Sequence, residues 1–135
     1  MTQGRNANRN GREAENIIAG VLERRGIPFT RQYRIGNGIF DTPVAADFYA
    51  PSVKPFPNGL IIESKWQQVA GTAEEKLCYL VENIHYCYPC TTVIVIDGDG
   101  FRVGALRWLR SQAGHGRLFA VLSLVEFVTW SNSNL

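Results

Sequence analysis

The chain has 135 residues, 45% of them hydrophobic and 19% charged, which is typical of one globular domain with a single core. No apolar run approaches the roughly 20 residues of a membrane-spanning helix, and the polar start lacks the apolar stretch of a secretory signal, so we expect a cytosolic protein without membrane contact. Three cysteines, an odd number, argue against a disulfide framework.

The net charge of +2 is small, but the positive charge is unevenly distributed. Seven arginines and only three acids occur in the first 34 residues, and 11 of the 14 basic residues are arginine. Arginine makes bidentate contacts to phosphate, whereas scattered charge also serves solubility alone. From charge alone, phosphate binding and solubility remain equally good interpretations.

The N-terminal quarter divides into two segments. Residues 1–11 contain almost no apolar side chains and predict a flexible basic arm that precedes a single domain of residues 12–135. A helix is expected from about Arg12 to Arg25, because apolar residues recur there at helical spacing. Gly26 and Pro28 then end it.

The rest of the chain alternates between strand and helix patterns. A capping box at Thr72 and Glu75 predicts the start of a second long helix. A short helix is expected over residues 103–112, and residues 118–130 fit either a strand or a helix. The expected strands span residues 29–35, 44–49, 60–66 and 91–96. This order predicts an α/β fold in which helices flank a mixed sheet.

One group of charged residues points to chemistry. Glu63 and Lys65 lie two apart on an expected strand, so they share one face, and Ser64 faces the other way. Asp47 lies near the end of the preceding strand, and a hairpin would bring it beside Glu63. Two carboxylates suit the hard ion Mg²⁺, and the Ser64 carbonyl could also ligate it. A neighbouring lysine could position a water molecule and hold a phosphate.

This arrangement resembles the PD-(D/E)xK nuclease superfamily, with Asp47, Glu63 and Lys65 in the places of its motif. The resemblance covers about residues 12–97 and implies a restriction-endonuclease-like αβββαβ core. Members usually carry a metal-binding glutamate on the leading helix, and Glu15 occupies a similar place to that of archaeal Holliday-junction resolvases. Ala46 replaces the proline of the motif.

The resemblance implies a Mg²⁺-dependent DNA endonuclease in which Mn²⁺ substitutes for Mg²⁺. A structure-selective Holliday-junction resolvase, a sequence-specific homing or restriction enzyme, and a non-catalytic DNA-binding protein with the same fold remain alternatives. Because a double-strand cut needs two active sites, a homodimer or higher oligomer is expected. A compact free-standing nuclease of this kind would suit a bacterial, archaeal, phage or mobile-element gene.

Several polar residues are candidates for supporting roles. Gln67 follows the motif on the same face and could contact water or phosphate, or merely bond a loop. Contacts to DNA are considered for Arg12, Arg31, Arg34 and Lys76. A zinc site is not expected, since only one Cys-x-x-Cys knuckle is present. The residues that such a site would use are Cys78, His85, Cys87 and Cys90.

Overall fold

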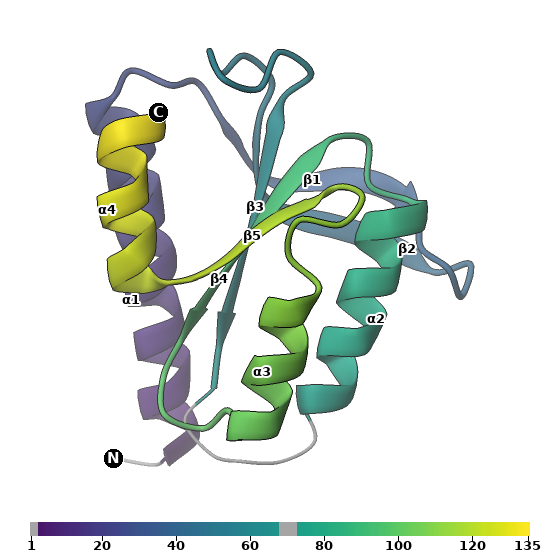
Figure 1. Ribbon diagram of the computed structural model, residues 1–135. Helices are drawn as coiled ribbons and strands as arrows, with labels where there is room; N and C mark the ends of the chain where they lie inside the picture. Colours follow the sequence, from purple (N-terminus) through teal and green to yellow (C-terminus); the bar gives the residue numbers. More distant parts are fainter. Residues whose placement is uncertain (1–2, 68–72) are drawn as a thin grey trace.

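The computed structural model describes residues 3–67 and 73–135, which form four helices and five strands (Figure 1). Thr72 of the expected capping box lies outside the described residues. The helices are α1 (Gln3–Arg24), α2 (Ala73–Tyr86), α3 (Val103–Ser111) and α4 (Leu124–Asn134). The strands are β1 (Thr30–Asn37), β2 (Pro43–Ala50), β3 (Leu60–Trp66), β4 (Thr91–Asp97) and β5 (Leu118–Ser123).

The strands form one five-stranded mixed sheet in the order β1-β2-β3-β4-β5. The pairs β1–β2 and β2–β3 are antiparallel, whereas β3–β4 and β4–β5 are parallel. Each parallel connection is made through a helix, as such connections usually are. The α/β class with helices flanking a mixed sheet is therefore confirmed.

Helices cover both faces of the sheet, and each face has its own apolar core instead of the single core that the chain length predicted (Figure 1). On one face α2 and α3 pack through residues such as Leu80 and Leu109. On the other face α1 and α4 pack side by side through residues such as Ile18 and Phe127. Strands β3 and β4 lie between the two layers, which explains their continuous apolar runs.

Helix α1 begins at Gln3, nine residues before the expected start at Arg12. The backbone of residues 3–11 thus continues the helix, and the flexible basic arm expected over residues 1–11 stays a prediction. A scarcity of apolar residues shows only that a segment cannot form a core. Gly and Asn, which are poor helix formers, make up most of this segment, so helix propensity does not explain the extension.

The C-terminal segment, for which the sequence allowed a strand or a helix, contains both. Strand β5 ends at Ser123, whose hydroxyl accepts a hydrogen bond from the Glu126 amide at 3.1 Å. The Glu126 carboxylate in return accepts from the Ser123 amide at 2.7 Å, which completes a capping box for α4. Strand therefore changes to helix without an intervening loop.

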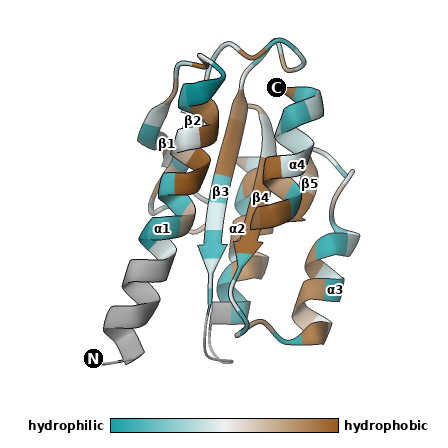
Figure 2. Cartoon of the chain, turned by 90° about the vertical axis from the view of Figure 1, so that its left-hand side faces the viewer, coloured by the Kyte–Doolittle hydropathy of each residue, from teal (hydrophilic) through white to brown (hydrophobic). Residues whose placement is uncertain are grey.

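Strand β3 changes in character along its length (Figure 2). It begins with the fully buried residues Leu60, Ile61 and Ile62, and ends with polar side chains toward the arrowhead in Figure 2. Charged groups thus emerge from the sheet at its carboxyl end, where an open α/β sheet usually binds ligands. No helix in the described part of the chain has both the length and the apolar character to cross a membrane.

Candidate active site

The pairing of β2 with β3 stops just before Asp47 and Glu63. Its last backbone pair joins Phe48 to Ile62. Beyond this pair, backbone amides of the two strands donate to side chains and not to the backbone of the neighbouring strand. The Glu63 carboxylate accepts from the Asp47 amide at 3.3 Å, and the Asp47 carboxylate accepts from the Ser64 amide at 2.7 Å. The two carboxylates therefore satisfy backbone groups that the sheet leaves free, and lie next to each other as the sequence predicted.

Glu63 is a buried carboxylate, with only 2% of its surface exposed. Burial, followed by repulsion from Asp47, raises the pKa of Glu63 from 4.5 to about 7. The positive charge of Lys65 and hydrogen bonds from the Asp47 amide and the Tyr88 hydroxyl act in the opposite direction. The site thus holds a negative charge that nearby protein groups only partly compensate.

Tyr88 completes the surroundings of Glu63, a role for which the sequence carries no signal. It follows α2 and is 1% exposed, and its hydroxyl donates a hydrogen bond to Glu63 Oε2 at 3.2 Å. Burial and the negative charge of Glu63 raise the pKa of Tyr88, so the hydroxyl keeps its proton and remains a donor. Tyr88 therefore fixes the orientation of the Glu63 carboxylate.

Lys65 lies two residues beyond Glu63 on β3, opposite Ile96 in the parallel ladder with β4. By strand alternation it shares a face with Glu63 and with Ile61, which belongs to the core under α2 and α3. Its side chain is partly exposed, unlike that of Glu63. Lys65 thus adds a positive charge near Glu63, on a side chain that is more exposed than the carboxylate.

The family profile of the PD-(D/E)XK nuclease superfamily domain matches residues 6–135. The chain belongs to the PD-(D/E)XK nuclease superfamily. Searches of curated proteins and of solved structures gave no significant match. The matched segment contains Asp47, Glu63 and Lys65, so the carboxylate pair and lysine lie within a superfamily domain that extends to residue 135.

Within this PD-(D/E)XK domain, Gln67 anchors the turn between β4 and α3. Its side-chain amide donates to the Gly100 carbonyl at 3.0 Å, and its backbone carbonyl accepts from the Gly100 amide at 2.7 Å. Gly98 lies against the same carbonyl, where a Cβ atom would approach the oxygen to 2.3 Å. Gln67 was expected either to contact water or phosphate or to hydrogen-bond a loop, and the structure shows the bond to a loop.

Glu15 lies on α1, the helix that covers the opposite face of the sheet from the one that Glu63 shares with Ile61. Its carboxylate forms an ion pair with Arg31 at 3.3 Å, and Arg31 lies over the Phe48 ring. The role of Glu15 as a third metal ligand therefore stays a prediction. The other predicted DNA-contacting residues have exposed side chains, namely Arg12, Arg34 and Lys76.

The donor chemistry of the site fits a hard divalent cation. Asp47 and Glu63 offer carboxylate oxygens, and their mutual repulsion would be relieved by a cation between them. In the part of the chain that the structure describes, no three His, Cys, Asp or Glu side chains converge on a common point. Of the four residues weighed for zinc, Cys78 is exposed and Cys90 is buried in the core.

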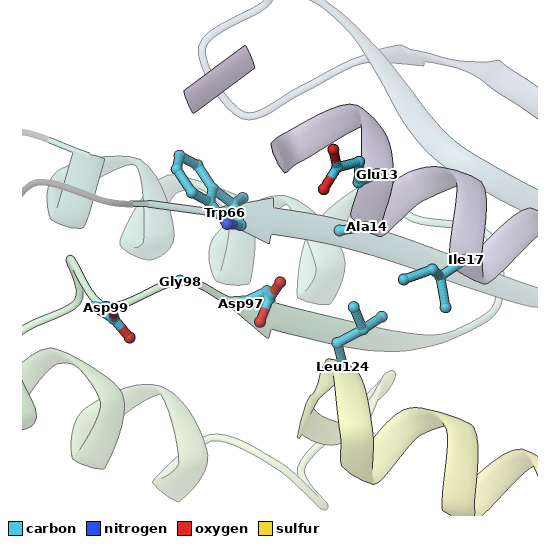
Figure 3. Close-up of a pocket in the computed structure, with 8 residues that line it drawn as sticks. All are labelled: Glu13, Ala14, Ile17, Trp66, Asp97, Gly98, Asp99 and Leu124. Carbon is cyan, nitrogen blue, oxygen red and sulfur yellow. The ribbon is translucent and has the colours of Figure 1, made fainter. Parts of the chain in front are cut away.

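A separate cleft of about 300 Å³ lies on the α1 side of the sheet, at the carboxyl ends of β3 and β4 (Figure 3). Glu13 and Ile17 of α1 face Trp66 and Asp97 across it. Glu13 is exposed at the rim of this cleft, so its side chain remains in contact with solvent.

Proposed function

We propose that this protein is a metal-dependent DNA endonuclease that hydrolyses phosphodiester bonds at Asp47, Glu63 and Lys65. The observation that carries the proposal is the carboxylate pair. Glu63 is held almost fully buried beside Asp47 by backbone and Tyr88 donors, at the place where the β2–β3 ladder ends. Keeping two carboxylates together in this way costs stability, and a bound cation would compensate for it.

Each residue of the group has a distinct task in this proposal. Asp47 and Glu63 would hold Mg²⁺, or Mn²⁺ in its place, with the Ser64 carbonyl as a further oxygen ligand. Such a bound ion lowers the pKa of water and neutralises charge on a phosphate. Lys65, which is more exposed than Glu63, would hold the scissile phosphate and orient or deprotonate the attacking water.

DNA is the proposed substrate because the superfamily is one of nucleases and because arginines are concentrated in the first 34 residues. Exposed Arg12 and Arg34 would contact the backbone, together with Lys76 of α2. A double-strand cut would require two copies of the site, so a homodimer is part of the proposal. Sedimentation of the protein with and without DNA tests that part separately.

Cleavage of two DNA substrates tests the proposal. The purified protein is incubated with supercoiled plasmid and with a four-way junction, in Mg²⁺, Mn²⁺ or EDTA. We expect cutting that requires the metal and falls by roughly 10²-fold or more in Lys65→Ala and Glu63→Ala. Lys54→Ala, which removes an exposed lysine from the loop before β3, is the matched control and should cut at the parental rate.

The pattern of products separates the kinds of nuclease. Preferential cutting of the junction would indicate a structure-selective resolvase, and cutting at one plasmid sequence would indicate a site-specific enzyme. Salt-sensitive DNA binding without any metal-stimulated cutting would contradict the proposal and favour a non-catalytic DNA-binding protein.

A further inference from the structure

Gln32 has an unusual backbone conformation for a residue within a strand. Its φ of 51° lies in the left-handed region, which costs energy for residues with a side chain. Among the described residues other than glycine, only Asp41 shares this property, with φ of 60° in the turn between β1 and β2. Aspartate in a turn adopts this conformation readily, whereas glutamine in a strand has no such local reason.

The strain lies directly opposite Asp47. Arg31 pairs with Phe48 and Tyr33 pairs with Ala46, so Gln32 and Asp47 face each other between these two pairs. Neither residue is itself paired in the β1–β2 ladder, which keeps its register across this missing pair and shifts register only further on, between Arg34 and Gly36. The missing pair therefore coincides with the carboxylate proposed to bind the cation.

The missing pair also marks a change in the face that each strand presents. Phe29, in the connection directly before β1, packs into the core under α1, and Tyr33, after the missing pair, packs into the core under α2. The two residues are separated by an even number of positions, so a regular strand would place them on one face. On β2 the same change occurs between Ala46 and Phe48. Asp47 thus lies at the point where the inward-facing side chains of the hairpin change from the core under α2 to the core under α1.

The Gln32 side chain makes a second link to the same carboxylate. Its amide nitrogen lies 3.4 Å from Asp47 Oδ1, while Asp47 Oδ2 accepts from the Ser64 amide. Each oxygen of Asp47 therefore has a donor on a different strand, and together the two donors define the plane of the carboxylate. The Gln32 side chain is exposed, so it points to Asp47 although water is available as an alternative partner.

We infer that Gln32 is a positioning residue for Asp47, through a strained backbone that turns the hairpin and an amide that orients the carboxylate for its cation. The inference rests on the proposed function. Residues in rare backbone conformations persist where the surrounding structure requires them, and they concentrate at functional sites. Here the conformation and the side-chain contact converge on one carboxylate.

The test separates the amide from the backbone conformation. Gln32→Gly accepts the positive φ and removes the amide, and Gln32→Asn tolerates the same φ but has a stem one methylene shorter. Asp41→Gly is the matched control, because it relieves the same conformation in the turn, away from Asp47. Thermal unfolding of the metal-free protein, calorimetric Mn²⁺ binding and steady-state cleavage are measured for each.

We expect Gln32→Gly to unfold at the parental temperature or above it, yet to bind Mn²⁺ roughly tenfold more weakly. Its kcat should fall while KM for DNA changes little. Gln32→Asn should lose Mn²⁺ affinity in the same way, and Asp41→Gly should keep it. Parental Mn²⁺ affinity in both Gln32 variants would overturn this inference alone, even if they unfolded at lower temperature. Absence of Mn²⁺ binding by the parent would overturn the proposed function and this inference with it.

Discussion

Glu63→Gln tests the energetics of the site in the metal-free protein. The substitution keeps the size of the side chain and removes its charge. The carbonyl oxygen of the new amide can still accept from the Asp47 amide, and its NH₂ group can donate to the Asp47 carboxylate or to the Tyr88 oxygen. The variant therefore loses an unfavourable buried charge and keeps the bond from the Asp47 amide, whereas the Tyr88 hydroxyl loses its acceptor on residue 63.

The magnitude follows from the pKa of Glu63, which is about 7 in the folded protein against an ordinary value of 4.5. Because the folded state holds the proton more tightly than the unfolded state, the contribution of Glu63 to stability is fully present below pH 4.5 and is lost as the pH rises to 7. At about 1.4 kcal/mol per pH unit, the loss reaches about 3 kcal/mol above pH 7. Because glutamine does not ionise, Glu63→Gln does not lose this stability as the pH rises.

Thermal unfolding in EDTA between pH 4.5 and pH 8 measures the effect. At roughly 3–4 °C per kcal/mol for a domain of this size, the unfolding temperature of Glu63→Gln relative to the parent should rise by about 10 °C between pH 4.5 and pH 8. Glu23→Gln, on an exposed part of α1, should show no such pH-dependent difference. A Glu63→Gln protein whose unfolding temperature relative to the parent does not rise between these pH values would refute the argument that Glu63 is held as a costly buried charge.

Two further substitutions test contacts around the site. Tyr88→Phe removes the hydroxyl that donates to Glu63. Urea unfolding at pH 8 in EDTA should show a free energy of unfolding about 2 kcal/mol below that of the parent, and the difference should shrink toward pH 4.5. An equal loss at both pH values would contradict this assignment. Gly98→Ala introduces a Cβ atom 2.3 Å from the Gln67 carbonyl oxygen at a φ of 94°, so it should cost more than about 2 kcal/mol in thermal unfolding. Its control Gly104→Ala, in open space on helix α3, should instead stabilise the protein by about 0.5–1 kcal/mol, and equal effects at the two glycines would refute the steric argument.

The central strands and the motif could be predicted from local pattern. Leu60–Trp66 and Thr91–Asp97 carry apolar runs that a strand buried on both faces explains. Alternation along β3 then fixes Glu63 and Lys65 on one face, and the hairpin places Asp47 beside them. Periodicity of two and short connections are properties of the chain itself, so they can be deduced without coordinates.

The supporting contacts could not be predicted, because they join residues that are distant in sequence. Tyr88 reaches Glu63 across 25 positions, and nothing in the segment HYCYPC marks its hydroxyl as a donor to a carboxylate. The positive φ of Gln32 likewise has no local signal, since glutamine does not favour it. The start of α1 at Gln3 could not be deduced for a different reason, because composition reports on burial and not on backbone conformation.

Calorimetric titration of the protein with Mn²⁺ tests the central claim most directly, because it asks whether Asp47 and Glu63 form a cation site without requiring the correct DNA. The titration is made at about pH 7.5, above the pKa of Glu63 of about 7. Asp47→Asn removes one carboxylate charge, and Asp41→Asn makes the same change in the hairpin turn as a control. We expect binding by the parent and by Asp41→Asn, and at least roughly tenfold weaker binding by Asp47→Asn. A folded parent that binds no Mn²⁺, or an Asp47→Asn protein that binds it as the parent does, would contradict a cation site at Asp47 and Glu63.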